Sequence, residues 1–240
     1  MNYLDELKND YIVQGYGRLC NGGRYRVINA KTEEELIKLL LEYLTEYGLE
    51  PLISTDIFIK HQNFLERHHI YLNKSGEYDS LYLIGKEGDY TFRGNAMIVP
   101  VVECNIELRG DSMCYPKHPN IHIKAYDNSV IIYGRKCNIE LHDSSSLKGG
   151  EWNHITCRNY SNAELLFGCE AKAYDYAKIN YIESDKCVIP FKSNNIILYG
   201  NAISRIEIPD DNDAITQGRK ALLIWENRLK KWYENRNTQR

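Results

Sequence analysis

The residues best suited to chemistry in this chain are carboxylates that recur at a fixed interval. Sixteen residues separate each member from the next in the series Asp111, Asp127, Asp143, Asn159 and Asp175. Stacked about 5 Å apart, as strands of a sheet are, such carboxylates could bind calcium or act on a glycan as an acid–base pair. Asp and Asn side chains also accept hydrogen bonds from turn amides. The regularity favours the turn role, because a catalytic pair does not need five copies, and Asp127, Asp143 and Asp175 stand as the catalytic alternative.

Histidine and cysteine offer no comparable arrangement. His122 and His154 occupy equivalent positions two repeats apart, without an evident carboxylate or thiolate partner for a metal site. The seven cysteines form no C-x-x-C pair, and Cys157 and Cys187 fall on positions expected to point inward. Cysteine behaves as a small hydrophobic residue in such places. We therefore expect reduced structural thiols, and neither a metal nor a cofactor is predicted.

Tyrosines flank the same recurring position and form a candidate binding surface. The chain has 19 tyrosines against 5 phenylalanines. Those that adjoin the Asp/Asn series are Tyr126, Tyr160, Tyr174 and Tyr176. Tyrosine is favoured where one edge of a ring stays wet, and it is common at protein interfaces. A partner surface and simple packing at the turn are both open interpretations.

A glycine-rich and arginine-rich segment lies near the N-terminus. Residues 11–30 (YIVQGYGRLCNGGRYRVINA) contain Arg18, Arg24 and Arg26 among four glycines, which could cradle a phosphate. The spacing is that of neither a P-loop nor a G-x-G-x-x-G fingerprint. We expect two short strands around a glycine turn, with a small-ligand site as the alternative.

The elements that must position these residues follow from the period. Self-similarity at a fixed interval indicates stacked units that share one core. Small residues also recur at this interval, at Ser129, Ser145, Ser161, Ala177 and Ser193. A second set recurs half a period away, at Cys137, Asn153, Cys169, Asp185 and Asn201. Inside each unit, apolar and polar residues alternate as in a strand, with Ile123 and Ala125 inward beside His122 and Lys124.

Two short strands per sixteen residues predict a mainly β protein, a two-sheet β-solenoid (β-helix). A three-sided helix with longer coils is the alternative. We place the solenoid at residues 67–210, with residues 147–153 (LKGGEWN) forming a bulge or loop and residues 113–119 a loop excursion. The motif NNIILYG, at residues 194–200, aligns best with residues 129–134 (SVIIYG), which indicates a bulge near Pro190.

Helical segments flank the repeat. Residues 1–66 are expected to form an α-rich N-terminal α/β region, with a helix from Thr32 to Gly48 begun by a Thr32–Glu35 capping box, and a second helix ending near Glu66. Residues 211–240 read as an amphipathic helix. Its apolar stripe is Leu222, Trp225, Leu229 and Trp232. The stripe could cap or brace the final coils, or form an interface helix with a second chain.

Composition limits the classes of partner. A net charge of −3 over 240 residues argues against a strong electrostatic nucleic-acid binder. The N-terminal sequence MNYLDELKND lacks an apolar leader, and no apolar stretch reaches the eighteen residues of a membrane span. We therefore expect a cytoplasmic protein without a membrane association.

The unit IHIKAYDNSV at residues 121–130 resembles the short Y-D-N-A and Y-G-N-A repeats of β-solenoid proteins from phages and mobile elements. The resemblance spans roughly residues 104–208. It departs from the pattern at HDSSS (142–146) and RNYSN (158–162). It implies the solenoid fold and a phage-associated or mobile-element origin, and it implies no particular activity.

Three functions follow as expectations. The first is a non-catalytic scaffold or protein-binding module, such as an inhibitor, adaptor or structural component, with a protein partner or self-association. The second is a β-helix enzyme that acts on polysaccharide through the corner aspartates. The third is a nucleotide or small-ligand binder that uses the N-terminal arginines.

Overall fold

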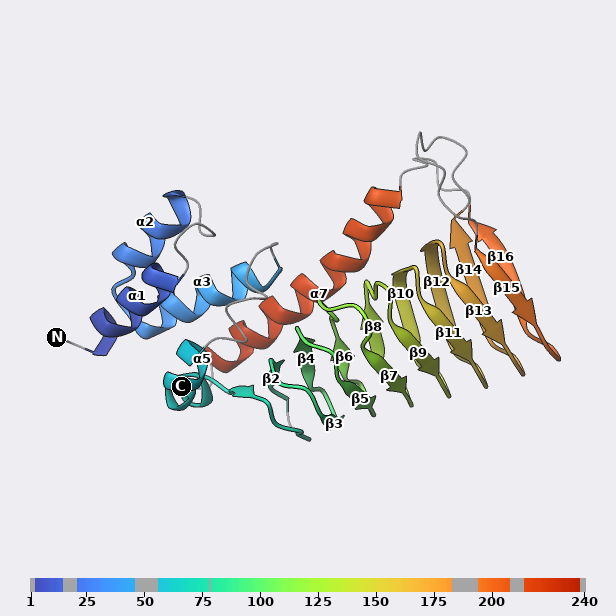
Figure 1. Ribbon diagram of the computed structural model, residues 1–240, viewed down its shortest axis with the longest axis horizontal. Coiled ribbons are helices and arrows are strands. Elements are labelled where there is room, and N and C mark those ends of the chain that lie inside the picture. The colour runs from blue at the N-terminus through green and yellow to red at the C-terminus, as the bar shows by residue number, and fades with distance from the viewer. Residues whose placement is uncertain are drawn as a thin grey trace. The chain divides into compact units, whose positions relative to one another are not determined.

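The fold is known from a computed structural model, which describes residues 3–14, 21–45, 56–77, 79–182, 194–207 and 214–237. The chain divides into two compact units, Met1–Leu72 and Asn73–Arg240. Figure 1 labels their elements.

The first unit is built from short helices. They are α1 (Tyr3–Gln14), α2 (Asn21–Asn29), α3 (Glu33–Thr45), α5 (Asp56–Lys60) and α6 (Gln62–Arg67), followed by strand β1 (Ile70–Leu72). The predicted capping box begins α3: the Glu35 N–H donates to Thr32 Oγ1 at 3.2 Å, while the Glu35 carboxylate accepts from the N–H of Lys31. Leu36, Ile37 and Leu40 of α3 are buried, as the amphipathic pattern predicts.

The expected strands at residues 11–30 are wrong. The described parts of this segment belong to two helices, α1 and α2. Val27 and, just after α2, Ala30 are buried, and helices α1 and α2 contact each other. The glycines at the start of α2 resemble those of a hairpin turn, because glycine is accepted at helix ends as well as in turns.

The second unit is a β-solenoid of about six turns with two parallel sheets. Sheet A runs in the order β2 (Leu81–Ile84), β4 (Met97–Pro100), β6 (Met113–Cys114), β8 (Val130–Ile132), β10 (Ser146–Glu151), β12 (Asn162–Phe167), β14 (Lys178–Ile182) and β16 (Ile203–Glu207). Sheet B comprises β3 (Asp89–Phe92), β5 (Asn105–Leu108), β7 (His122–Ala125), β9 (Asn138–Leu141), β11 (His154–Cys157), β13 (Glu170–Ala173) and β15 (Asn195–Leu198). The two-sheet prediction is confirmed.

Most coils repeat every sixteen residues, as predicted. Ile123, Ile139 and Ile155 pair in register along sheet B, and each is buried. Their polar neighbours, such as His122 and His154, point outward, so the alternation of a half-buried strand holds. A small buried residue begins each strand of sheet A or directly precedes it: Ser80, Ala96, Ser112, Ser129, Ser145, Ser161, Ala177 and Ala202. The glycines of β10 sit at a register shift, which confirms the bulge predicted there.

Two coils depart from this period and correct the predicted series. Asn105 pairs with His122, seventeen residues on, so Gly110 aligns with Asp127 and Asp111 lies one place past the series. Glu170 pairs with Asn195, twenty-five residues on. Residues 195–198 therefore belong to sheet B, and the expected match of residues 194–200 to the sheet A strand at residues 129–134 is wrong.

The twenty-five-residue coil also changes which residues occupy the predicted small and turn positions. Ala202 takes the small position assigned to Ser193, and Gly200 takes the turn position that follows Asp175. Asn201 therefore follows the Asp/Asn turn and is not part of the half-period set. Four of the predicted positions lie outside the described residues, namely Asp185, Cys187, Ser193 and the bulge near Pro190.

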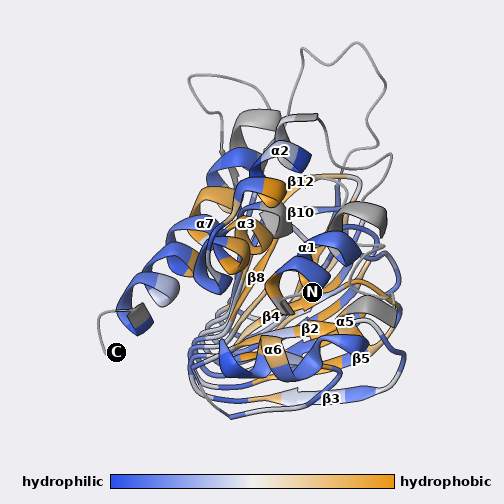
Figure 2. Cartoon of the chain, turned by 90° about the vertical axis from the view of Figure 1, so that its left-hand side faces the viewer, coloured by the Kyte–Doolittle hydropathy of each residue, from blue (hydrophilic) through white to orange (hydrophobic). Residues whose placement is uncertain are grey.

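Helix α7 (Ala214–Asn237) braces the solenoid along the outer face of sheet A. It contacts β8, β10 and β12. Trp225 is 0% exposed and packs its ring 5.5 Å from that of Tyr115. Toward the C-terminal end of α7, Arg228 donates to the backbone oxygen of Asp111 at 2.5 Å and Trp232 Nε1 to that of Asp79 at 3.1 Å. The helix thus runs back along the early and middle coils (Figures 1 and 2), whereas the sequence predicted a cap or brace on the final coils.

Candidate functional site

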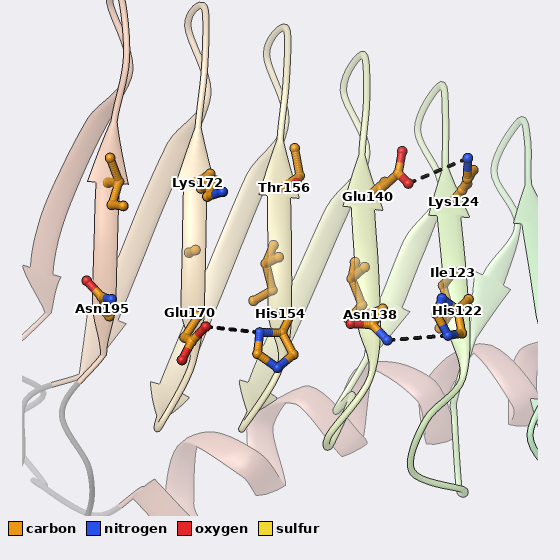
Figure 3. Close-up of a pocket in the computed structure, with 14 residues that line it drawn as sticks. His122, Ile123, Lys124, Asn138, Glu140, His154, Thr156, Glu170, Lys172 and Asn195 are labelled. Atoms are coloured by element: carbon orange, nitrogen blue, oxygen red, sulfur yellow. Dashed lines mark hydrogen bonds and ion pairs between the residues drawn. The ribbon is translucent and has the colours of Figure 1, made fainter.

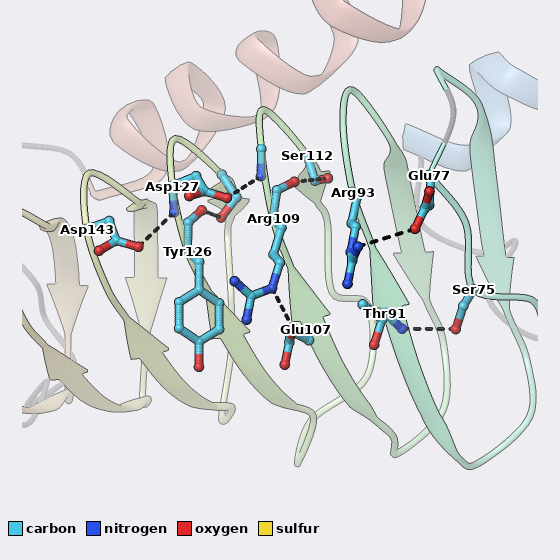
Figure 4. A network of polar contacts seen from close by, with 12 residues as sticks. Ser75, Glu77, Thr91, Arg93, Glu107, Arg109, Ser112, Tyr126, Asp127 and Asp143 are labelled. Atoms are coloured by element: carbon cyan, nitrogen blue, oxygen red, sulfur yellow. Dashed lines mark hydrogen bonds and ion pairs between the residues drawn. The ribbon is translucent and has the colours of Figure 1, made fainter.

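The corner ladder, defined as Gly110, Asp127, Asp143, Asn159, Asp175 and Gly200, joins successive coils at the end of sheet B. All six have positive φ, between 54° and 68°. Asp127 Oδ2 accepts a hydrogen bond from the N–H of Gly110 at 2.8 Å, and Asp143 Oδ2 accepts one from the N–H of Asp127 at 3.3 Å (Figure 4). Asn159 and Asp175 repeat this contact at 3.2 and 3.0 Å. Each catalytic alternative, Asp127, Asp143 and Asp175, is thus engaged with a turn amide of the preceding coil.

The opposite corner is held by a buried amide and thiols. Asn153 accepts from the N–H of Cys137 at 2.8 Å and donates to the carbonyl of Gly134 at 2.8 Å. Burial raises the pKa of Cys137 to about 11 and that of Cys169 to about 12. A raised thiol pKa disfavours the nucleophilic thiolate at neutral pH. The described cysteines Cys104, Cys114, Cys137, Cys157 and Cys169 are all free and buried, so they act in packing.

The outer face of sheet B carries a regular grid of polar side chains. Its first row is His122, Asn138, His154, Glu170 and Asn195, and its second row is Lys124, Glu140, Thr156, Lys172 and Ile197. These residues line an open depression of about 340 Å³ (Figure 3). His154 Nδ1 lies 3.2 Å from Glu170 Oε2, and Lys124 Nζ lies 3.5 Å from Glu140 Oε1. Lys124 and Lys172 are balanced by Glu140 and Glu170, so the face has no strong field of one sign.

Aromatic and cationic side chains form a column beside this grid, in two stacked groups of three. The aromatic–cationic column is Arg109, Tyr126, His142, Arg158, Tyr174 and Tyr199. The Arg109 guanidinium lies 4.4 Å from the centre of the Tyr126 ring, whose other face stacks on His142 at 4.7 Å (Figure 4). Arg158 lies 4.7 Å from the ring of Tyr174, which stacks on Tyr199 at 4.7 Å and 5°.

These contacts hold the rings in place within the chain itself. The carboxylate of Glu107 lies 2.7 Å from Arg109 Nε and raises the pKa of that guanidinium, which stays charged. Because ring faces are occupied within the column, the rings present their edges and hydroxyl groups outward.

The structure separates the four predicted tyrosines into two sets. Tyr126 and Tyr174 belong to the column, on the sheet B side of the corner ladder. Tyr160 and Tyr176 lie on the other side, stacked on each other at 5.3 Å and 9°. They are 68% and 53% exposed, whereas Tyr126 and Tyr174 are half-buried.

Sequence reasoning missed Arg109, His142, Arg158 and Tyr199. Each directly precedes a member of the corner ladder, as Tyr126 and Tyr174 do. The signal was therefore present one place before each turn residue. It was hidden because the side chains alternate between aromatic and cationic types, and because Tyr199 follows the longer coil.

The remaining candidates serve contacts within the chain. Arg26 of α2 pairs with Glu42 of α3, which places it in a helix contact of the first unit; Arg24 lies on the same helix, and Arg18 lies outside the described residues. Trp225, Leu229 and Trp232 of the proposed interface helix are at most 5% exposed, and Leu222 is half-buried. The stripe thus packs on the chain's own solenoid, which is the brace of the two predicted alternatives.

Comparison of the chain with protein-family models, with curated proteins and with solved structures gave no match. Within the described ranges, no three His, Cys, Asp or Glu side chains gather in a way that would hold a metal ion. None of the described helices combines the length and apolar character needed to cross a membrane.

Proposed function

We propose that this protein is a non-catalytic binding module that holds a protein partner against the outer face of sheet B and the aromatic–cationic column. The observation that carries the proposal is the column itself, a run of Tyr, Arg and His side chains held in place by stacking. Tyrosine and arginine dominate the energetically important positions of protein interfaces. Side chains that are already ordered lose little conformational entropy when a partner binds.

The charged residues around the aromatic–cationic column favour a protein partner over a polyanion. The adjoining grid contains both acids and bases, so it offers hydrogen bonds and charges of both signs to a surface of mixed polarity. A polyanion would instead favour a continuous basic stripe. Sheet A is braced by α7, which leaves the sheet B face as the broad sheet surface for recognition.

The corner aspartates support the non-catalytic part of the proposal. Their carboxylates accept hydrogen bonds from turn amides, a structural task that explains why they recur in several coils. The repeat's resemblance to solenoids of phages and mobile elements favours an inhibitor, adaptor or structural component encoded by such an element.

The test is capture of a partner from a bacterial lysate by the tagged full-length chain. The double variant Tyr126→Ala/Tyr174→Ala should lose the captured protein, because interface positions of this kind cost about 2 kcal/mol or more, roughly thirtyfold in Kd. Tyr160→Ala/Tyr176→Ala tests the other side of the corner, and Lys231→Ala on α7 is the control that should retain capture. Undiminished capture by the Tyr126/Tyr174 variant, with folding intact, would refute the proposed face.

A further inference from the structure

The last coil of the solenoid presents an unusual apolar end. β15 and β16 are the final strands of sheets B and A in the described part of the chain. Leu198 of β15 occupies the same inward position as Ala173, Cys157 and Leu141. Those three are 0% exposed, because another coil covers each of them, whereas Leu198 is 41% exposed. Within the described ranges, no further coil covers this end of the core.

The backbone of β15 directs part of its hydrogen-bonding groups away from the preceding coil. The N–H groups of Asn195 and Tyr199 donate to the carbonyls of Cys169 and Ala173 in the preceding coil. In a parallel ladder, successive residues of a strand direct their N–H and C=O groups to opposite neighbours. The backbone N–H and C=O groups of Ile196 and Leu198 therefore point away from β13, toward the position that a further coil would occupy.

The end also carries few of the charges that usually protect an exposed edge. Residues 194–207 (NNIILYGNAISRIE) contain two charged side chains, Arg205 and Glu207, and no proline. The preceding coil, residues 169–182, contains Glu170, Lys172, Asp175 and Lys178. Natural proteins place charge and proline on free edges to prevent pairing with another chain. Here an approaching neutral surface meets little electrostatic repulsion.

Tyr199 marks the end of the aromatic–cationic column. One face of its ring stacks on Tyr174 at 4.7 Å, and the residue is 44% exposed. In the coils below, Tyr126 has a ring or a guanidinium on both faces. The column can therefore continue across this end.

We propose that the end formed by β15 and β16 is the contact surface for a second copy of this chain. A single extended peptide would pair with one of the two edges and leave the apolar interior between them uncovered. The end of another solenoid covers both strand edges and the apolar interior together. The β15–β16 end of a second copy has two edges and an apolar interior of the same dimensions, so it matches this end. A twofold axis perpendicular to the solenoid axis brings the edges together as antiparallel pairs in an isologous contact.

This contact is separate from the proposed partner face. Two joined copies would each keep the sheet B face accessible and would display it twice, which increases the avidity for a partner with two sites. The end-to-end contact does not rest on the proposed function, and each can fail without the other.

The test is the mass of the purified full-length chain in solution, measured by light scattering over a range of concentrations. The wild type should reach the mass of a dimer, and Leu198→Lys should weaken dimerisation at least tenfold. Leu223→Lys is the matched control, because it places the same charge on a residue that is 52% exposed on α7, and it should dimerise as the wild type does. A monomer at every concentration, or a dimer that Leu198→Lys leaves unchanged, would overturn the proposal.

A second measurement needs no variant. Hydrogen exchange in peptides that span residues 195–205 should slow as protein concentration rises, since the free amides of β15 and β16 become paired. Peptides from β9 and β11, which pair within the chain, should not change. Concentration-independent exchange at residues 195–205 in a dimeric sample would place the contact elsewhere and reject the end-to-end arrangement.

Discussion

At the residue scale, the corner ladder shows how one position can combine two requirements. The backbone there has positive φ, which glycine, asparagine and aspartate accept more readily than other residues. An Asp or Asn side chain adds a hydrogen bond to the amide of the coil before it. Glycine occupies the same position in the coils on either side of the Asp/Asn members, at Gly94, Gly110 and Gly200, where only the backbone requirement is met.

Substitution at Asp127 should separate these two contributions. Asp127→Asn keeps both and should change the free energy of unfolding by less than about 1 kcal/mol. Asp127→Gly keeps the backbone conformation but loses the hydrogen bond to Gly110, which costs about 1 kcal/mol. Asp127→Ala loses the bond and adds left-handed strain, for a total of about 2–3 kcal/mol. Urea unfolding measures all three.

Asp111 supplies the matched control for this series. The sixteen-residue count makes it equivalent to Asp127, but the seventeen-residue coil moves it past the turn. Its side chain is exposed, and its contact with Arg228 uses the backbone oxygen. Asp111→Ala should therefore be nearly neutral. A loss as large as that of Asp127→Ala would contradict the register described above.

The sequence alone could not reveal this shift. One additional residue lies between Cys114 and His122, and the chain around it still reads as a plausible repeat with Asp at the expected interval. Only the strand pairing shows that Gly110 takes the position, because glycine fits the turn without the side-chain signature. Where the period is unbroken, from Asp127 to Asp175, the sequence predicts each turn residue correctly.

At the scale of elements, the first unit contains a polar cluster that joins α1 to the segment around α5. Lys60 Nζ lies 2.8 Å from Asp10 Oδ2 and 2.7 Å from Glu6 Oε1, while the buried ring of His61 contacts the same Asp10 oxygen at 2.7 Å. Hydrogen bonds from Lys60 and then His61 lower the pKa of Asp10 below its usual 3.8. The ionised form is thus the one that the folded unit stabilises.

This lowered pKa predicts an acid-side loss of stability. A group with a depressed folded-state pKa contributes its full stabilisation above the unfolded value, and the contribution disappears as the pH falls from 3.8 through the lower folded value. Asp10→Asn removes this titration, so its thermal midpoint should fall less than that of the wild type between about pH 6 and pH 3.

Glu6→Gln is the control for the acid experiment. It removes the other carboxylate beside Lys60 but leaves the contacts of Asp10 with Lys60 and His61 in place. Its midpoint should keep most of the wild-type dependence in the same pH range. Circular dichroism follows the helical signal, and equal pH dependence in Asp10→Asn and wild type would refute the assignment.

Helix α7 allows a second prediction at this scale. Trp225 is completely buried between the helix and the solenoid, so Trp225→Ala should destabilise the second unit by about 3–5 kcal/mol. Its indole N–H finds no acceptor among the described residues, so Trp225→Phe loses packing alone and should cost much less than Trp225→Ala.

Leu223→Ala on the exposed side of α7 should change stability by no more than about 0.5 kcal/mol. Denaturant unfolding of the three variants ranks these effects. Equal effects of Trp225→Ala and Leu223→Ala would show that α7 does not brace the solenoid.

A helix could be predicted from the sequence where caps, an apolar face and strong helix-forming residues occurred together. The segment from Glu33 to Thr45 has a cap, an apolar face and strong helix formers, and it was predicted within a few residues. The segment at residues 11–30 has a weak pattern and several glycines, and its helical form depends on packing such as the burial of Val27. For α7, the stripe was evident, but whether it faced its own solenoid or a second chain depended on tertiary contacts.

At the scale of the whole molecule, the solenoid is nearly one-dimensional, because each coil pairs with the coil before it and the coil after it. The two-sheet arrangement could be read from the period and from the alternation within each strand. The grid on sheet B then follows, since equivalent residues of successive coils must form rows. The insertion that makes the last coil twenty-five residues long could not be inferred from that rule.

The period itself can be tested by deletion. Removing residues 144–159 takes out sixteen residues and joins Asp143 to Tyr160, so the corner ladder, the small residues and the inward pairs all stay in register. Removing residues 145–159 takes out fifteen. Since side chains alternate between faces at every residue, a shift of one would turn the inward residues of the following strands outward.

Both deletions displace α7 by about one coil relative to its contacts with Asp79 and Asp111, so that cost is shared. The sixteen-residue deletion should keep a cooperative thermal transition and a β-rich circular dichroism spectrum at reduced stability. The fifteen-residue deletion should lose both. If the two variants behaved alike, the coil would tolerate slippage, and the rows of side chains on sheet B would not be fixed by the sequence period.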